Sequence, residues 1–344
     1  MDRIVECVPN ISEGRDLEKI RRIVSVIDQV EGVKLLSYEP DADYNRTVIT
    51  YVGTPEGVVE AGRRLLKAAF EEIDMTKHKG EHPRMGAVDV FPFVPVRGVT
   101  MDDCVALARE LGKWAGESLG IPVYYYEYAA TTPERKNLST IRAGEYEGLE
   151  EKLKDPRWRP DEGPAKFVPR FGGVVIGARD FLIAYNVNID ISDVTPAKRI
   201  AETIRESGVL IKSAGGKKIM GDDGKPVRIP GRLKSVKAMG VTLEKYGITQ
   251  VSMNLTNFHV TPPHIAYEAV KLEAEKLGVQ VKGSEIVGLV PLEALAMAGR
   301  FYSRMEDREP PEDPDQLLEI AVDKLGLSTL EEFIPEKKVI EYMI

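Results

Sequence analysis

The sequence predicts an α+β protein of two similar subdomains, and three observations support this fold class. Short β-rich runs alternate with helical patterns along the chain. A stretch rich in proline, glycine and charge, residues 144–173, interrupts the alternation. After it, the order strand, helix, strand, strand, helix, strand begins again. Because 344 residues exceed the usual size of one domain, we expect domains at residues 1–178 and 179–344, the second with a helical tail.

The first half is expected to begin with a strand and to end with one. Alternating apolar residues with β-branched or aromatic side chains predict strands at residues 3–9, 33–39, 46–53, 88–96 and 121–128. Apolar residues at helical spacing predict helices at residues 14–30, 55–73 and 101–117. The run at 88–96 contains Pro92 and Pro95, which lack the N–H that a central strand donates. We therefore expect this run to be an edge strand or the wall of a cleft.

The second half repeats the pattern with other residues. Its predicted strands are residues 180–189, 231–243, 249–255 and 279–290, and its predicted helices are residues 196–207, 262–277 and 292–302, with a last helix opening at Asp313-Pro314. Three Thr-Pro pairs, in which threonine is expected as the N-cap, are Thr54-Pro55, Thr195-Pro196 and Thr261-Pro262. Thr100 with Asp103 three residues later approximates a capping box.

Composition excludes several classes of protein. A net charge of -8 argues against nucleic acid as a partner, because phosphate-backbone binders usually carry a basic face. No segment approaches the roughly 18 apolar residues of a membrane span, and the first ten residues do not suggest a signal peptide. Cys7 and Cys104 are too few for a disulfide framework and are expected in the core. We expect a cytoplasmic protein that binds no membrane.

The segment KHKGEHPRMG, residues 77–86, raises the question of metal binding. His78, Glu81 and His82 spell H-x-x-E-H, which chelates zinc when it lies on a helix. Gly80 weakens a helix there by about 1 kcal/mol, and Pro83 disfavours the helical conformation at His82. We therefore expect a loop without metal. In a loop, His82 would be flanked by Lys77, Lys79 and Arg84, cations that lower a histidine pKa and keep the ring neutral and basic; a surface turn without catalysis is the alternative.

Five blocks of the sequence closely resemble the glutamate formimidoyltransferase family, including the transferase half of formimidoyltransferase-cyclodeaminase: VECVPNISEGRD, NRTVITYVG, HKGEHPRMGAVDVFPFVPVRGVTMDDC, IRAGEYEGLEEKL and GSEIVGLVPLEAL. The resemblance implies two ferredoxin-like subdomains with facing mixed sheets, outer helices and a substrate tunnel between them, in a homodimer. It implies transfer of a formimidoyl group from N-formimidoyl-L-glutamate to the co-substrate tetrahydrofolate, a step of histidine degradation, without metal. Because no cyclodeaminase half follows, a separate cyclodeaminase is a possible partner.

The resemblance also assigns site residues. His82 falls on the family's catalytic histidine, and Glu39 stands where animal relatives carry aspartate. A carboxylate there could orient the imidazole or bind the pterin, and a surface glutamate near a turn is the alternative. The folate-binding stretch falls on Gly163, Pro164, Ala165, Lys166, Phe167, Val168, Pro169, Arg170, Phe171 and Gly172. Phe167 and Phe171 would offer stacking surfaces. Arg46, Arg84, Lys166 and Arg170 would attract the anionic substrates. A basic stretch at 211–237 would meet folate tails or form a solvated hairpin.

The amidine chemistry fits a single neutral histidine. One proton must leave the attacking pterin nitrogen, and one must reach the departing amine of glutamate. Two alternatives remain beside formimidoyl transfer. One is an enzyme that uses 5-formyltetrahydrofolate, for formyl transfer or for cyclisation to the methenyl form. The other is a carrier that binds reduced folate without turnover.

Overall fold

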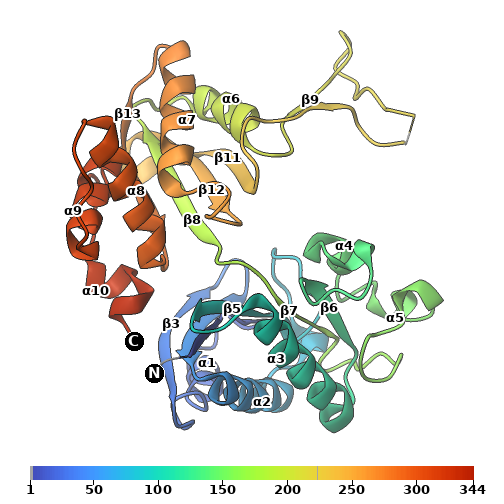
Figure 1. Ribbon diagram of the computed structural model, residues 1–344. Coiled ribbons are helices and arrows are strands. Elements are labelled where there is room, and N and C mark those ends of the chain that lie inside the picture. The colour runs from blue at the N-terminus through green and yellow to red at the C-terminus, as the bar shows by residue number, and fades with distance from the viewer. Residues whose placement is uncertain (1–2, 223) are drawn as a thin grey trace. The chain divides into compact units, whose positions relative to one another are not determined.

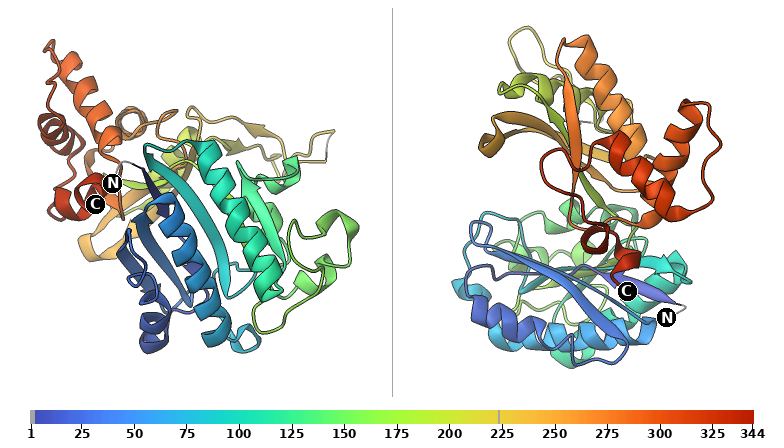
Figure 2. Two further views of the ribbon diagram at one scale, coloured as in Figure 1. Left: turned by 60° about the horizontal axis from the view of Figure 1, so that its bottom comes forward. Right: turned by 90° about the vertical axis from the view of Figure 1, so that its left-hand side faces the viewer.

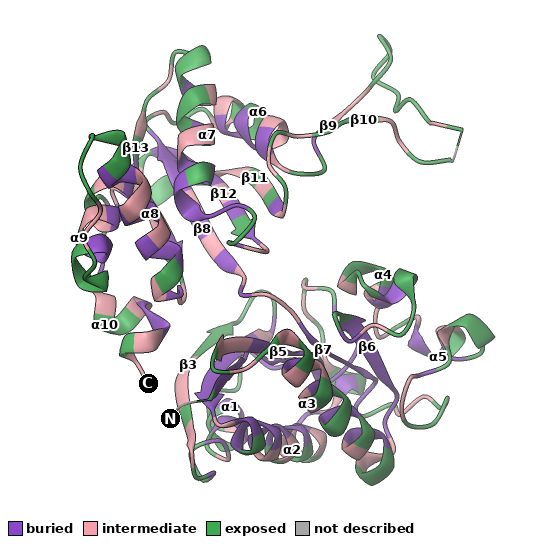
Figure 3. Ribbon diagram, in the orientation of Figure 1, coloured by how far each residue is buried: buried purple, intermediate pink, exposed green. Residues whose placement is uncertain are grey.

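The computed structural model describes residues 3–222 and 224–344. The chain divides into two compact units, of which the first ends at Asp180 and the second begins at Phe181 (Figure 1). Both combine helices with β-sheet, which confirms the predicted mixture of α and β structure. In each unit the interior strands of the sheet are largely buried, while the helices alternate buried and exposed residues (Figure 3).

The first unit is built on one sheet whose strands are β1 (Ile4–Cys7), β2 (Asn10–Ile11), β3 (Val33–Asp41), β4 (Arg46–Gly53), β5 (Val88–Arg97), β6 (Val123–Glu127) and β7 (Val174–Ala178). Strands β1 and β2 lie in succession between β4 and β5, so the order across the sheet is β3, β4, β1 with β2, β5, β7, β6. The β5–β7 and β6–β7 pairs are parallel and the others antiparallel.

Helices cover the two faces of this sheet unequally. Helices α1 (Leu17–Val24), α2 (Pro55–Glu72) and α3 (Met101–Trp114) lie together on one face and enclose the larger core, which includes Tyr51, Phe91, Phe93 and both cysteines (Figure 2). The short helices α4 (Leu138–Arg142) and α5 (Leu149–Lys152) bury a smaller core with residues of β5, β6 and β7 on the other face. The burial of both cysteines is as predicted.

Three first-unit expectations were wrong. Helix α1 ends at Val24 and not at Val30, because Val24, Ile27 and Val30 are spaced by three and are joined by successive i to i+3 turns of 3.1 Å. The strand β5 is interior and not at an edge. The strand β7 was not predicted at all, since its five buried residues follow two glycines and show no alternation.

Strand β5 accommodates its prolines in the sheet interior by position. Pro92 lies opposite the break between β1 and β2, where its carbonyl accepts a hydrogen bond from the Val8 N–H at 3.4 Å. Because N–H and C=O of one strand residue point to the same side, the donor that Pro92 lacks also faces this break. Pro95 lies beyond Phe93, the last β5 residue paired with β7. Neither proline therefore removes a required ladder hydrogen bond.

The second unit repeats the connectivity with a smaller sheet. Its elements are β8 (Ile183–Ile189), α6 (Val194–Ile204), β9 (Val209–Leu210), β10 (Arg228–Ile229), β11 (Val236–Leu243), β12 (Ile248–Leu255), α7 (Pro263–Lys276), β13 (Val281–Val287), α8 (Leu292–Met305), α9 (Pro314–Leu325) and α10 (Pro335–Lys338). The antiparallel sheet runs β11, β12, β8, β13. The same order, second, third, first, fourth, relates β3, β4, β1 and β5. Strands β9 and β10 form the base of a projecting arm (Figure 1).

Helix caps test the sequence signals residue by residue. Thr54 accepts a hydrogen bond from the Gly57 N–H at 3.2 Å, and Thr100 with Asp103 forms the predicted capping box. Asp313 caps α9 as expected. The prediction that Thr195 and Thr261 are N-caps was wrong. Asp193 caps α6, and the Thr261 hydroxyl donates to the Lys234 carbonyl at 2.7 Å. No helix in the described part of the chain is long and apolar enough to cross a membrane.

We expect Thr54→Ala to lower the free energy of unfolding by about 1 kcal/mol, because the first turn of α2 loses its side-chain acceptor. The matched control is Thr195→Ala, which removes an exposed hydroxyl that caps no helix and should cost less than half as much. Chemical denaturation followed by circular dichroism measures both. Equal losses in the two variants would contradict the assignment.

Candidate active site

The loop that carries His82 is not helical. It follows a 3-10 turn, Met75–Lys77, and residues 78–84 adopt neither helix nor strand. His78 and His82 therefore do not share a helix face, which removes the geometric basis of zinc chelation by H-x-x-E-H. Among residues 3–222 and 224–344 there is no cluster of three or more histidine, cysteine or carboxylate side chains placed to hold a metal ion.

His78 ties this loop to the turn between β3 and β4. Its Nε2–H donates to the Asn45 carbonyl at 2.8 Å, and its Nδ1 accepts from the Arg84 Nε–H at 3.2 Å. Because the guanidinium can only donate, His78 is held as the neutral ring protonated on Nε2. Burial is the main reason that its pKa lies below the ordinary value. His78 thus connects both ends of the loop to the sheet.

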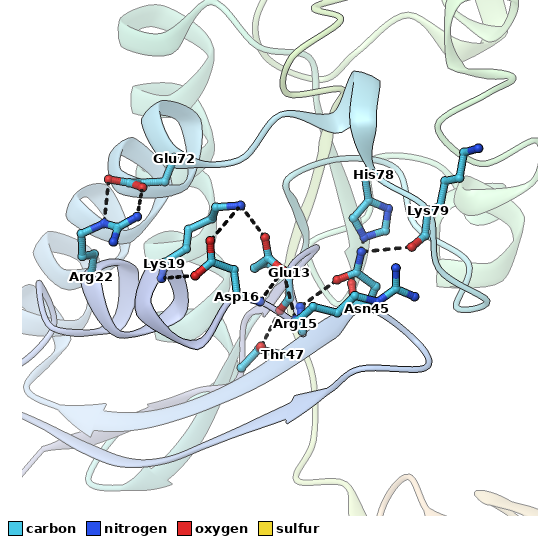
Figure 4. A network of polar contacts seen from close by, with 11 residues as sticks. Glu13, Arg15, Asp16, Lys19, Arg22, Asn45, Thr47, Glu72, His78 and Lys79 are labelled. Atoms are coloured by element: carbon cyan, nitrogen blue, oxygen red, sulfur yellow. Dashed lines mark hydrogen bonds and ion pairs between the residues drawn. The ribbon is translucent and has the colours of Figure 1, made fainter.

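Asn45 organises the other side of this contact. It has a left-handed φ of 49°, which asparagine tolerates better than most residues. Its Oδ1 accepts from the Gly14 N–H at 2.9 Å, and its Nδ2 donates to the Lys79 carbonyl at 3.0 Å (Figure 4). Gly80 must approach the turn closely, since a Cβ there would lie 2.2 Å from the Tyr44 carbonyl oxygen. The glycine that disfavours a helix is therefore required for packing.

His82 lies half-buried against Arg46, the first residue of β4. Nη1 of Arg46 contacts Nε2 of the imidazole. Since Arg46 has no acceptor, Nε2 is the acceptor and a neutral ring carries its proton on Nδ1. That Nδ1 is buried and has no partner of hydrogen-bond geometry in the described chain. The Tyr44 ring packs edge-on, with centroids 5.8 Å apart.

The electrostatics keep His82 neutral near pH 7. Burial lowers its pKa most, followed by the guanidinium groups of Arg46 and Arg142, while Asp89 and the Pro83 carbonyl oppose the shift. The direction agrees with the sequence prediction, but the cations differ from the expected ones. Lys77 is exposed and pairs with Asp74 at 3.5 Å, and Lys79 is exposed. The cations that lower the pKa of His82 are therefore Arg46 and Arg142, which the fold brings close, and not the lysines near it in the sequence.

Asp89 and Arg142 form a buried ion pair beside the site, and sequence reasoning missed both residues. The Asp89 carboxylate is 1% exposed and accepts from the Met85 N–H at 2.9 Å and from Arg142 Nε at 3.3 Å. Arg142 is the last residue of α4. This helix packs on the sheet that contains β5, the strand to which Asp89 belongs. A lone carboxylate within the apolar run VDVFPF was the available signal, because an unpaired buried charge is costly.

Arg84 does not have the role that the sequence suggested. It is 7% exposed, and its guanidinium pairs with Glu145 at 3.1 Å and with both carboxylate oxygens of Glu147 at 2.9 and 2.5 Å. Because these pairs and the contact with His78 use its donors, Arg84 holds the loop in place and is not open to an anionic substrate.

The segment 163–172 is docked onto the residues that follow His82. The Ala87 N–H donates to the Phe171 carbonyl at 2.7 Å, and the Gly173 N–H donates to the Met85 carbonyl at 3.1 Å. The Tyr146 hydroxyl donates to the Pro169 carbonyl at 2.6 Å. Gly172 has a φ of 80°, and a Cβ there would lie 2.2 Å from the Met85 carbonyl oxygen. Two stretches predicted to contribute to one site are therefore brought together.

The side chains of this segment differ in accessibility. Phe171 is 0% exposed and packs on Phe70 with centroids 5.7 Å apart, so the expectation that it stacks on a ligand was wrong. Phe167 is half-buried and packs on Tyr146 at 5.3 Å. Val168 is also half-buried and Gly172 is buried. The exposed residues are Gly163, Pro164, Ala165, Lys166, Pro169 and Arg170.

Glu39 is exposed on β3, opposite Val48. Val48 and Arg46 share one face of β4, so Glu39 lies on the same sheet face as Arg46. The carboxylate that acts electrostatically on His82, however, is that of Asp89.

A neutral, half-buried histidine among arginines, in a unit of mixed sheet and helices, defines a candidate site for acid–base group transfer. The family models that match are the formiminotransferase domain, N-terminal subdomain, over residues 4–179, and the formiminotransferase domain over residues 184–344. The chain belongs to the formiminotransferase family.

Relatives at high identity include proteins of two lengths. A formimidoyltransferase-cyclodeaminase of Dictyostelium discoideum is 48% identical over 100% of this chain and 61% of its own length. Glutamate formimidoyltransferases of Thermoplasma acidophilum and Streptococcus pyogenes are 46% and 43% identical, over 88% and 89% of this chain and 93% and 95% of their own lengths. The chain thus spans about three fifths of the bifunctional relative.

We expect Gly172→Ala to destabilise the first unit more than Gly120→Ala. Both glycines have positive φ, at 80° and 64°, but an added Cβ meets the Met85 carbonyl at position 172 and meets nothing within 4 Å at position 120. Because both substitutions strain a backbone of positive φ, that cost cancels in the comparison. The losses in the free energy of unfolding should therefore differ by more than about 1 kcal/mol. Denaturant titration measures it. A Gly120→Ala loss as large would argue against tight docking of the segment.

Arg46→Gln should raise the pKa of His82 toward its ordinary value, because a cation that penalises the protonated ring is removed. Lys79→Gln is the control, and its exposed, solvent-screened charge should leave this pKa unchanged. The measurement is an NMR pH titration of histidine Cε1–H signals. A shift with Lys79→Gln and none with Arg46→Gln would show that sequence neighbours set the pKa after all.

Proposed function

We propose that this chain is a glutamate formimidoyltransferase, which moves the formimidoyl group of N-formimidoyl-L-glutamate to tetrahydrofolate. The observation that carries the proposal is His82: a neutral imidazole, half-buried and flanked by Arg46 and Arg142, on a loop against which the segment 163–172 docks. Two relatives named glutamate formimidoyltransferase match this chain over 93% and 95% of their own lengths, which supports formimidoyl transfer as the reaction.

His82 is suited to the proton transfers of this reaction. The attacking amine must lose a proton, and the departing nitrogen of glutamate must gain one. In the structure the Nε2 lone pair of the neutral ring accepts from the Arg46 N–H. When Arg46 turns to a substrate carboxylate, Nε2 is free to accept the first proton, and the resulting imidazolium supplies the second. The depressed pKa makes the imidazolium a ready donor, while burial limits competing exchange with water. Such acid–base assistance contributes about 10² to 10⁴ in rate.

Arg46 and Arg142 supply local positive potential in an acidic protein. Both substrates carry carboxylates, and the net charge of the chain is -8, so attraction must come from the site itself. Arg142 is partly neutralised by Asp89, whereas Arg46 makes its polar contact with His82. We assign Arg46 to substrate attraction, with the exposed Lys166 and Arg170 as further cations on the docked segment.

We also propose that each unit is a ferredoxin-like subdomain. Support comes from the shared element order, strand, helix, strand, strand, helix, strand, and from the shared strand order across both sheets. In this description α3, β6 and β7, with the helices between the two strands, are additions to the first unit. The helices α8, α9 and α10 are additions to the second.

His82→Ala should lower turnover by about two to four orders of magnitude while leaving the fold intact, because the ring is half-buried and outside the core clusters. His259→Ala, which removes an exposed histidine, is the matched control and should keep full turnover. The assay combines N-formimidoylglutamate with tetrahydrofolate and follows the folate product by absorbance and glutamate by a coupled assay. Unchanged turnover in His82→Ala would remove the catalytic assignment.

The same assay with 5-formyltetrahydrofolate separates the alternative substrate. Turnover with the formimidoyl donor and none with the formyl compound is the expected result. The reverse result would assign the pocket to formyl chemistry. Binding of tetrahydrofolate without turnover of either donor would identify a carrier.

A further inference from the structure

A cavity lies within the second unit, between the first turn of α7 and the last three turns of α8. Its volume is about 440 Å³, which falls in the range of small-molecule sites. Its lining residues are His264, Met297, Arg300, Phe301, Arg304 and Met305. The family match and the chemistry of His82 assign no role to these residues.

The α8 wall of the cavity has two chemical stripes. Met297, Phe301 and Met305 recur at intervals of four and form an apolar stripe. Arg300 and Arg304 recur at the same interval and form a cationic stripe beside it. Arg300 is ion-paired with Glu293, whereas Arg304 is exposed and makes no ion pair within residues 3–222 and 224–344. The wall therefore offers one uncompensated cation next to an apolar surface.

His264, in the first turn of α7, lines the cavity beside Phe301 and carries a ring nitrogen that no described residue contacts by a hydrogen bond. The side chain is 6% exposed, and its ring stacks on Phe301 with centroids 4.6 Å apart. Its Nδ1 is buried and has no hydrogen-bond partner in the described chain. Burial lowers the pKa of His264 to about 4, so the ring is neutral at pH 7 and presents one donor and one acceptor. Folded proteins rarely leave such an atom unsatisfied, so a partner from outside the chain, a water or a ligand, is expected at this ring.

The start of α7 adds positive potential at the same place. Pro262 occupies the N-cap position and supplies no side-chain acceptor. The Ile265 and Ala266 N–H groups donate to the Pro262 carbonyl at 3.1 and 3.2 Å, so the contribution at His264 is the positive end of the helix dipole. The nearby carboxylate of Glu268 is engaged by the Tyr302 hydroxyl at 2.9 Å and by Lys271 at 3.8 Å. Among the described residues, the lining of the cavity itself contains two arginines and no carboxylate.

We propose that this cavity binds a small organic anion, a carboxylate on an aromatic or alkyl body. The carboxylate is held by Arg304 and the first turn of α7, with His264 as a hydrogen-bond partner. The apolar body packs on Met297, Phe301 and Met305. The proposal does not depend on the reaction at His82, because each of these groups belongs to α7 or α8.

Benzoate is the probe, added to the full chain and followed by isothermal titration calorimetry. Benzyl alcohol has the same ring without charge, and inorganic phosphate has charge without a ring. We expect benzoate to bind saturably at one site per chain. Both controls should bind at least about tenfold more weakly, because benzyl alcohol lacks the charge that the arginine binds and phosphate lacks the ring that the apolar stripe binds. Absence of saturable benzoate binding, or equal binding of phosphate, would overturn the proposal.

Two further measurements place the binding. Arg304→Gln should weaken benzoate binding by about tenfold or more, while Arg308→Gln, an exposed arginine outside the cavity, should leave it unchanged. In protein labelled at histidine Cε1, benzoate should move the His264 signal among the four histidines. Unaltered affinity in Arg304→Gln, or a shift of His82 in place of His264, would refute the site. Both variants change exposed residues, so folding is expected to survive.

Discussion

The arrangement of the candidate active site depends on the hydrogen bonds of one half-buried imidazole. His78 joins the turn at Asn45 to the guanidinium of Arg84, and thereby closes the loop that carries His82. The contact requires a neutral ring, because a proton on Nδ1 would face the donors of Arg84. Burial provides this neutrality by lowering the pKa of His78. Without these hydrogen bonds, the position of His82 would depend on a short coil segment.

The three arginines around this loop differ in how far their charge is neutralised by carboxylates. Arg84 is saturated by Glu145 and Glu147, and so it is structural. Arg142 is paired with Asp89, which is buried in the sheet. Arg46 makes its polar contact with His82. Arginines can therefore lie close together in an acidic protein, since the charges of Arg84 and Arg142 are paired and Arg46 penalises protonation of the His82 ring.

The two units show how one connectivity supports different chemistry. Both follow the same strand order, but the first adds β6, β7, α4 and α5, which bring Arg142 and the segment 163–172 to the His82 loop. The second adds α8, α9 and α10, and α8 carries a methionine and arginine surface facing His264. The residues of both proposed sites therefore lie on the additions, the loops and the helices, while the repeated sheet supplies the scaffold.

Sequence by itself determined most of the elements and the family. Periodicity fixed α2, α3, β3 and β4 closely, because their apolar spacing matches their local geometry. Gly80 and Pro83 excluded a helix at His82, since both act on the local backbone. Tertiary structure alone decided that β5 is interior, that Arg84 and Phe171 are buried, and that Arg46, Asp89 and Arg142 surround His82. These facts depend on contacts between residues far apart in the chain, and such contacts leave no periodic trace in the sequence.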